Sequence, residues 1–586
     1  MPKLFAVALA LSAPIVIGAA VPTDSVPVYT LGMRDPAHQL FDVALDVTAR
    51  GQDFTLVMPV WTPGYYQRMD YADKVRGFAV TDVGGRPVSW RRDGSRWHIA
   101  APSGTRLRVH YQVLADRDFV AANFLDANKG YVSPAGVFAY PEGRLHAPVE
   151  LRIVPQPGWT VATGLAPLGK AANVWRAPDF DILYDSPILI GKLERLPSFR
   201  IRGVPHHVIG TGFGTIDRPQ LVSDLEKIVT AAVEMMGDIP YRDYSFIGIG
   251  PTQGGIEHLN STSFGFGRQD NRTPAGRLRL DAFLAHEYFH HFNVKRIRPI
   301  ELGPFDYGRE NRTRQLWVSE GLTVYYENIL LRRAGLIDTS AFLDDLSGNL
   351  RAYENAPGHR YQSLAQASYE TWEDGPFGRK DDDFNKTISY YDKGPVVGFM
   401  LDLAIRHATA NRRSLDDVMR ALYRDYYQRL GRGFTEREFR ATCEAIAGTS
   451  LADLFAYVDT TADPDYARYF GYAGLAVDMR PHALPGGWLG IALDSAQPGR
   501  IADVEWDSPA WKAGVRRGDL VLRSDLAKIA PLLPDEAQGR PVALTIGHQG
   551  AERRVDLTLD TKRERRFTLT PMPHADALQR RILASF

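Results

Sequence analysis

The spacing of apolar residues divides this chain of 586 residues into regions of different texture. In the first region, apolar Leu107, Val109, Tyr111 and Val113 alternate with polar neighbours, and residues 149–153 repeat the alternation. A period of two is typical of strands that bury one face. Short segments broken by Pro and Gly continue to about residue 200. The pattern therefore predicts an all-β, sandwich-like domain over residues 21–200.

From about residue 219 the apolar period lengthens to three and four. Residues 220–236 have this helical spacing, and so do several long stretches between 277 and 460. A short strand-like segment, residues 244–250, and the pair Gly254-Gly255 lie between them. A β-rich start that leads into many helices is an α+β arrangement. We expect a mainly helical domain over residues 201–470 in a multidomain α+β chain.

Short strands return after about residue 470. Residues 487–491 and the stretch SPAWKAGVRRGDLVL at 508–522 resemble a PDZ domain, which we place at 471–560. In that family a loop matching Trp488, Leu489, Gly490 and Ile491 caps a peptide's C-terminal carboxylate with backbone N–H groups. The alternative is a closed β module whose groove is occupied by its own chain. For the tail, 561–586, the run Lys562–Arg566 predicts solvated charges.

The first twenty residues have the layout of a secretory signal. Lys3 precedes an apolar stretch that Ser12 and Pro14 interrupt, and Gly18-Ala19-Ala20 supplies small residues for cleavage. The stretch is short for a membrane span, although an uncleaved anchor is the alternative. No other long apolar run follows. We expect an exported, periplasmic or secreted protein with no membrane span after signal cleavage.

Composition narrows the function classes. Hydrophobic residues make up 44% and charged residues 24%, an ordinary globular mixture. The 69 basic and 69 acidic residues cancel, which gives no electrostatic reason to expect nucleic acid as a partner. The single cysteine, Cys443, excludes a multi-cysteine zinc ribbon or iron–sulfur cluster, so metal chemistry here must use His, Asp and Glu. Oligomeric state leaves no trace in the sequence.

The sharpest chemical signal is HEYFH, with His286, Glu287 and His290. Residues four apart share one face of a helix, so both imidazoles can reach one ion while Glu287 lies to the side. Catalytic zinc takes three protein ligands and keeps an open position for water, which two histidines and one carboxylate provide. By chance such a motif arises on the order of once in fifty chains of this kind.

A second motif lies thirty residues further on. The stretch WVSEGLTVYYE at 317–327 looks like the third-ligand helix of gluzincin aminopeptidases. That resemblance implies Glu320 as the third zinc ligand and Glu327 as a carboxylate that orients a ligand histidine. Glu310 is a rival third ligand, but it lacks the aromatic–Ser–Glu–Gly setting.

Two further segments resemble the same clan. QGGIEH at 253–258 is similar to its Gly-x-Met-Glu-Asn segment, which implies substrate binding by Gly254 and Gly255 and capture of the α-amine by Glu257. Taken alone, this stretch would be a turn with a solvated Glu. Tyr391, in YDKG, matches the tyrosine that donates to the oxyanion; a packed aromatic is the alternative, and Tyr390 beside it could be mistaken for it.

Together these motifs are similar to the PDZ-containing glycyl aminopeptidase family. WTPGYY at 61–66 and NVKRIRP at 293–299 extend the likeness. The family implies an N-terminal β domain, a thermolysin-like zinc peptidase domain and a C-terminal PDZ domain. It also implies one zinc ion per chain and short peptide substrates that begin with Gly or Ala.

Three alternatives remain open at this stage. The first is an exported endopeptidase that cleaves substrates presented by the PDZ domain. The second is a PDZ adaptor with an inactive protease domain. The third concerns the metal, because two imidazoles and a carboxylate also suit cobalt or manganese.

Overall fold

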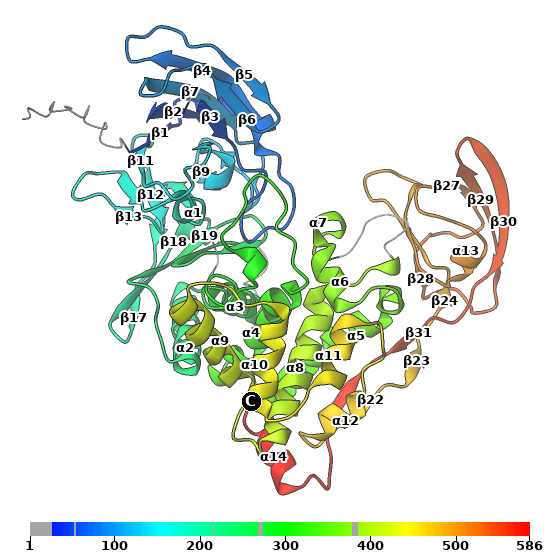
Figure 1. Ribbon diagram of the computed structural model, residues 1–586. Helices are drawn as coiled ribbons and strands as arrows, with labels where there is room; N and C mark the ends of the chain where they lie inside the picture. The colour runs from blue at the N-terminus through cyan, green and yellow to red at the C-terminus, as the bar shows by residue number, and fades with distance from the viewer. Residues whose placement is uncertain (1–25, 52–53, 215, 268–272, 378–384) are drawn as a thin grey trace, which may run out of the picture.

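The computed structural model describes residues 26–51, 54–214, 216–267, 273–377 and 385–586. The predicted signal segment, 1–20, lies outside this range. Figure 1 shows a β-rich domain in blue to cyan above a body of helices, with a second β unit in orange at the side. The expected order of a β-rich start followed by a mainly helical part is confirmed. Within the described residues, no helix is long and apolar enough to cross a bilayer.

The N-terminal domain is built from one mixed sheet and smaller antiparallel sheets around an apolar core. Leu107, Val109, Tyr111 and Val113 are buried, as their alternation predicts. The largest sheet has the order β13 (Ala166–Pro167), β14 (Val174–Ala177), β11 (Val149–Val154), β1 (Val28–Gly32), β2 (Leu40–Thr48), β7 (Arg106–Leu114) and β4 (Val75–Asp82). A second sheet has the order β10 (Tyr140–Pro141), β3 (Phe54–Val57), β6 (Arg96–Ile99) and β5 (Trp90–Asp93). A third sheet has the order β12 (Thr160–Thr163), β15 (Ile188–Gly191), β9 (Lys129–Val132) and β8 (Phe124–Leu125).

The sheet of the second domain starts slightly before the expected boundary at 200. Its strands are β16 (Glu194–Arg195), β18 (Val204–Thr211), β19 (Tyr244–Ile249), β21 (Ser261–Gly265) and β20 (Gly255–Glu257), with β17 (Phe199–Ile201) on β18. The two domains also share a core: Trp61 of the first domain donates its indole N–H to the Asp306 carbonyl at 3.0 Å and packs among residues of the second domain. The first domain is therefore firmly docked.

The helices agree with the spacing of apolar residues that predicted them. The spacing at 220–236 corresponds to α2, which starts after an Asp217 cap and ends at Gly237. The helices are α1 (Phe180–Tyr184), α2 (Arg218–Met236), α3 (Pro274–Phe289), α4 (Leu322–Arg333), α5 (Thr339–Asn355), α6 (Leu364–Tyr369), α7 (Thr371–Asp374), α8 (Tyr390–Ala408), α9 (Leu415–Leu422), α10 (Glu436–Ala447), α11 (Ala452–Asp459) and α12 (Tyr466–Gly471). Several pack on α8, which is buried along nearly all its length.

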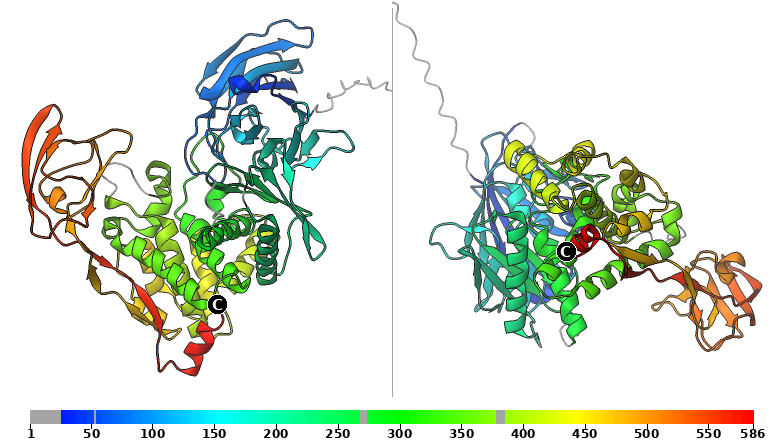
Figure 2. Two further views of the ribbon diagram at one scale, coloured as in Figure 1. Left: turned by 180° about the vertical axis from the view of Figure 1, so that it is seen from behind. Right: turned by 90° about the horizontal axis from the view of Figure 1, so that it is seen from below.

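The C-terminal β unit has its own apolar core. It comprises β24 (Gly487–Trp488), β25 (Ile491–Leu493), β26 (Ile501–Val504), α13 (Pro509–Lys512), β27 (Leu520–Ser524), β28 (Leu532–Leu533), β29 (Pro541–His548) and β30 (Ala551–Thr558). Figure 2 shows it projecting from the helical body.

The predicted carboxylate-binding loop of this unit has several of its N–H groups bonded within the chain. The N–H groups of Leu489 and Gly490 both donate to the carbonyl of Pro531, at 3.1 and 2.9 Å, and that of Trp488 donates to Asp560. Ile491 lies in the β25–β26 ladder. Three of the four loop residues, Trp488, Leu489 and Gly490, therefore have their N–H groups bonded within the chain rather than free for a peptide's carboxylate.

The chain beyond residue 560 differs from the expected solvated tail. Arg563 and Arg565 are exposed, but they lie in a strand, β31 (Arg563–Arg565), that pairs with β23 (Pro481–Ala483). Next, β32 (Thr568–Pro571) pairs with β22 (Leu475–Asp478), and α14 (Ala577–Leu583) follows. Phe586 then packs on Phe342 and Phe399 in the helical core. Exposed charged side chains on a paired strand look like a solvated charge run in the sequence, which explains the difference.

Candidate active site and metal centre

Three buried side chains converge at the end of α3. His286 and His290 lie one helical turn apart, and Glu320 reaches them from a π-helical turn, η5 (Trp317–Gly321). The two histidine Nε2 atoms are 2.9 Å apart, and Glu320 Oε2 is 3.2 Å from that of His290 and 3.7 Å from that of His286. Ligands at zinc's usual bond lengths on a tetrahedral ion would be about 3.4 Å apart, so the triangle has the size of a zinc site.

The histidine tautomers also favour a cation between these atoms. His286 Nδ1 donates to Glu327 Oε2 at 2.9 Å, and His290 Nδ1 donates to the carbonyl of Asn293 at 2.7 Å. Because both partners are acceptors, the neutral rings carry their protons on Nδ1. Their Nε2 lone pairs then point toward each other, an arrangement that a metal ion stabilises. The predicted ligand set and the predicted orienting role of Glu327 therefore fit this geometry.

A close contact between backbones places Tyr391 beside Glu320. A Cβ on Gly321 would lie 2.6 Å from the Cα of Gly394, so only glycine lets η5 and α8 approach this closely. Across this contact the Tyr391 hydroxyl donates to Glu320 Oε2 at 2.9 Å. Tyr390 points elsewhere, with its hydroxyl 3.2 Å from that of Thr371. The structure thus separates the two tyrosines as the sequence could not.

Glu287 lies against the edge strand β20. A Cβ on Gly255 would come within 2.4 Å of the Glu287 carboxyl carbon, so this glycine makes room for the carboxylate. Burial raises the pKa of Glu287 to about 7, although His286 and His290 oppose the shift. A buried carboxyl group that titrates near neutrality suits proton transfer.

Glu257, at the end of β20, is buried and 4% exposed. Its Oε1 atom has no hydrogen-bond partner among the described residues. The ammonium group of Lys295 lies 3.9 Å from this atom. Gly254, before the strand, has a φ of +85° and turns the chain into it. A buried carboxylate oxygen without a partner is costly, which points to a ligand with a donor group.

The first domain supplies residues to which the sequence assigned no role. A Cβ on Gly64 would lie 2.8 Å from Glu257 Oε2. Burial first, and then the charges of Glu320 and Glu257, raise the pKa of Tyr66 well above its ordinary value, so this ring lies near both carboxylates. Gly64 and Tyr66 both belong to the WTPGYY stretch, and the resemblance of this stretch to the family was the sequence signal that could have identified them. Asp185, also in the first domain, lies 2.6 Å from the Lys295 ammonium group, and no sequence motif identifies it.

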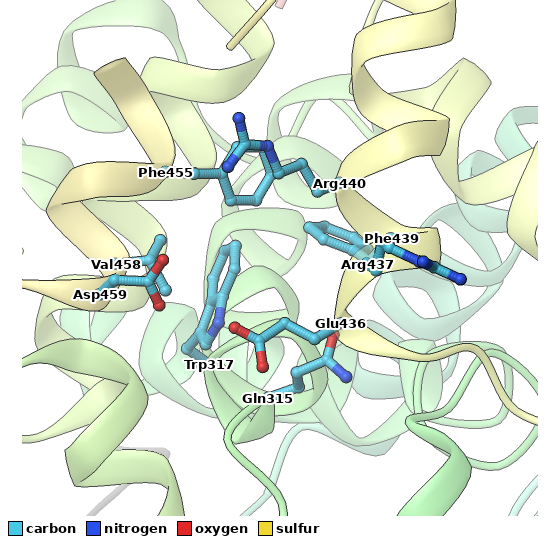
Figure 3. A pocket seen from close by; sticks show the side chains of 9 residues that line it. All are labelled: Gln315, Trp317, Glu436, Arg437, Phe439, Arg440, Phe455, Val458 and Asp459. Atoms are coloured by element: carbon cyan, nitrogen blue, oxygen red, sulfur yellow. The ribbon is translucent and has the colours of Figure 1, made fainter. Parts of the chain in front are cut away.

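The rival ligand Glu310 lies outside the cluster. Its carboxylate pairs with Arg312, and it is not grouped with the two histidines. A separate cavity of about 330 Å³ opens beside η5 (Figure 3). Its lining residues are Gln315, Trp317, Glu436, Arg437, Phe439, Arg440, Phe455, Val458 and Asp459, none of which was predicted as a site residue. The candidate chemistry is therefore not in this cavity.

Sequence profiles of known families match two regions of the chain. Residues 28–192 match the peptidase M61 N-terminal domain, and residues 279–397 match M61 glycyl aminopeptidase. Both matched regions are similar to the peptidase M61 family. The second match contains the two histidines, Glu320 and Tyr391. No curated protein matches the chain.

Solved structures share the fold. A crystal structure described as an aminopeptidase N family protein from Idiomarina loihiensis superposes with a TM-score of 0.84 at 24% identity, covering 94% of this chain and 99% of that one. An M1 zinc metallopeptidase from Deinococcus radiodurans is much less similar, with a TM-score of 0.46 at 15% identity, over 75% of this chain and 95% of that one. The first likeness shows that the whole domain arrangement occurs in a solved protein.

Proposed function

We propose that this protein is a zinc-dependent aminopeptidase that removes small N-terminal residues, Gly and Ala, from peptides. One zinc ion per chain would be held by His286, His290 and Glu320. The observation that carries the proposal is the buried Glu257 carboxylate, close enough to the triangle for its charge to act on His290, with one oxygen that has no partner among the described residues. Such a group suits an ammonium ion, and a free α-amine bound there fixes cleavage one residue from the end.

In the proposed reaction each residue of the site has a separate role. Zinc, when bound, would supply Lewis-acid polarisation of the scissile carbonyl and a more acidic water. Glu287 takes a proton from the attacking water and passes it to the leaving amine. Tyr391 donates a hydrogen bond to the developing oxyanion, a contribution of about 3 kcal/mol for a single donor. Glu327 and the carbonyl of Asn293 keep the histidine rings in the ligating tautomer.

The preference for small residues draws support from the packing around Glu257. The Gly64 backbone lies directly against the carboxylate, and the Tyr66 ring lies nearby. Little room remains beside the bound amine for a long side chain. We also propose export, with residues 1–20 as the signal. The C-terminal unit is proposed to be a PDZ-type module in which Leu489 and Gly490 bond to the chain's own Pro531.

The test compares substrates and variants. Hydrolysis of glycyl-, alanyl- and leucyl-p-nitroanilide is measured for wild type and Glu257→Gln, with and without a chelator, and the metal is identified by elemental analysis. We expect chelator-sensitive release from the glycyl and alanyl substrates, with a much higher KM in the variant. Equal cleavage of N-acetylated peptides, indifferent to Glu257→Gln, would instead indicate an endopeptidase. No turnover by metal-loaded protein would indicate an adaptor.

A further inference from the structure

A buried charge cluster lies directly behind the candidate amine site. Lys295 Nζ is 2.6 Å from Asp185 Oδ1 and 3.9 Å from Glu257 Oε1. The exposed fractions of the side chains are 7% for Lys295, 10% for Asp185 and 5% for Glu257. Asp185 caps the end of α1 in the first domain, whereas Glu257 and Lys295 belong to the catalytic domain. One ammonium group thus lies between two carboxylates from different domains.

Asp185 is held firmly in its place. Its Oδ2 atom accepts from the backbone N–H of Leu259 at 2.8 Å, and Oδ1 lies 3.3 Å from His258 Nδ1. Burial opposes ionisation of Asp185, but Lys295 and His258 together lower its pKa to about 2. The carboxylate is therefore charged at every physiological pH. Besides Lys295, it contacts His258 and Leu259, the two residues that follow Glu257 in the chain.

Lys295 can form a short ion pair with only one of the two carboxylates in this arrangement. A distance of 2.6 Å is a charge-assisted hydrogen bond, whereas 3.9 Å is too long for one. Because Lys295 is committed to Asp185, Glu257 Oε1 is left without a hydrogen-bond partner among the described residues. The substrate's ammonium group can then complete a second pair, so that both carboxylates and both cations are matched.

We propose that Asp185 is a positioning residue that holds Lys295 away from Glu257 and so keeps the α-amine site open. This inference rests on the proposed function, since it assigns the site to a free amine. Without the Asp185 charge, Glu257 is the one carboxylate of the described residues that lies within 4 Å of the buried ammonium. Lys295 would then pair with Glu257 and compete with the substrate's amine. The first domain, through Asp185, thereby determines whether the catalytic domain accepts a free N-terminus.

The test uses Asp185→Asn and the double variant Asp185→Asn/Lys295→Met. Asparagine can still accept from the Leu259 N–H, and the second change removes the competing cation. Asp116→Asn is the matched control, because it breaks an Asp–Lys pair of the same domain, 2.8 Å to Lys74, that is partly exposed. Each protein is assayed with glycyl-p-nitroanilide, and glycinamide binding to the metal-free protein is measured by calorimetry.

For Asp185→Asn we expect KM and the glycinamide dissociation constant to rise at least about tenfold, with kcat changed less than about threefold. The double variant should recover most of the lost affinity, which a merely misfolded protein would not do. A crystal structure of Asp185→Asn should show Lys295 Nζ about 3 Å from Glu257. Unchanged affinity in Asp185→Asn, or a loss that Lys295→Met does not reverse, would overturn the inference.

The two proposals fail in different ways. Wild-type turnover with unchanged affinity in Asp185→Asn would retain the aminopeptidase and remove this role of Asp185. Glycinamide binding that follows the predicted order without any turnover would retain the role and remove the aminopeptidase. Wild type that neither binds glycinamide nor turns over substrate would remove both.

Discussion

Asp281 lies on α3, the helix that carries both histidines, close to a second buried carboxyl group. Asp281 is 3% exposed and Asp224, on α2, is 1% exposed. Gln220 donates to both Asp224 oxygens at 2.9 Å, and Lys227 is 3.2 Å from that carboxylate. Burial and then the charge of Asp224 raise the pKa of Asp281 to about 7, although Arg277 and Lys227 oppose the shift.

The sign of the resulting pH dependence follows from proton uptake. In the unfolded chain Asp281 loses its proton near its ordinary pKa of 3.8, whereas in the fold it keeps the proton up to about 7. Between these values unfolding releases a proton, so a rise in pH favours unfolding. At 1.36 kcal/mol per pH unit, this window corresponds to about 4 kcal/mol of stability lost by pH 8, as an upper limit.

The perturbation is Asp281→Asn, which removes the titrating group and keeps its shape. We expect the variant to gain up to about 4 kcal/mol over wild type at pH 8 and almost nothing near pH 4. Urea unfolding followed by circular dichroism at several pH values measures this difference, with Glu226→Gln on the exposed side of α2 as the control. A variant no more stable than wild type at pH 8, or a gain independent of pH, would refute the reasoning.

Three further predictions concern the site. Tyr391→Phe should lower kcat about 10²- to 10³-fold in steady-state assays with little change in zinc content, because it removes one oxyanion donor. Glu327→Gln should weaken zinc binding about 10- to 100-fold in a competition titration, because His286 loses its carboxylate acceptor. Gly255→Ala should abolish most activity while the protein still binds zinc, because the added methyl group would displace the Glu287 carboxylate, 2.4 Å from its position.

Each of these can fail in a recognisable way. Full kcat in Tyr391→Phe would make the tyrosine a packing residue rather than a donor. Zinc affinity in Glu327→Gln equal to that of wild type would remove its role in orienting the histidine. If Gly255→Ala keeps normal kinetics, β20 and α3 separate more easily than the contact suggests.

The parts of the site that lie close together in sequence could be predicted well. The four-residue spacing of His286 and His290 on a helix already requires both rings to face one side, and the structure has this arrangement. Glu320 and Tyr391 required a family likeness, because the contact that joins them is made by glycines 73 positions apart, Gly321 and Gly394. Periodicity carries no information about such a pairing.

Contacts between distant segments account for what the sequence did not reveal. Asp185 has an ordinary helix-end position, and only the docking of the first domain brings it to Lys295. The loop at Leu489 and Gly490 keeps its PDZ-like residues, but the carbonyl of Pro531, about forty positions later, occupies its donors. A sequence motif shows which residues are present, but these contacts depend on which distant segment the fold places beside the motif.

The most direct test of the central claim is a product analysis on one peptide in two forms. A short peptide that begins with Gly-Gly and its N-acetylated twin are incubated with the zinc-loaded protein, and the products are identified by mass spectrometry. The account predicts stepwise loss of single glycines from the free-amine peptide and an intact acetylated twin. Internal cleavage of both forms at equal rates would contradict it, because the Glu257 carboxylate would then not be binding the substrate's free α-amine.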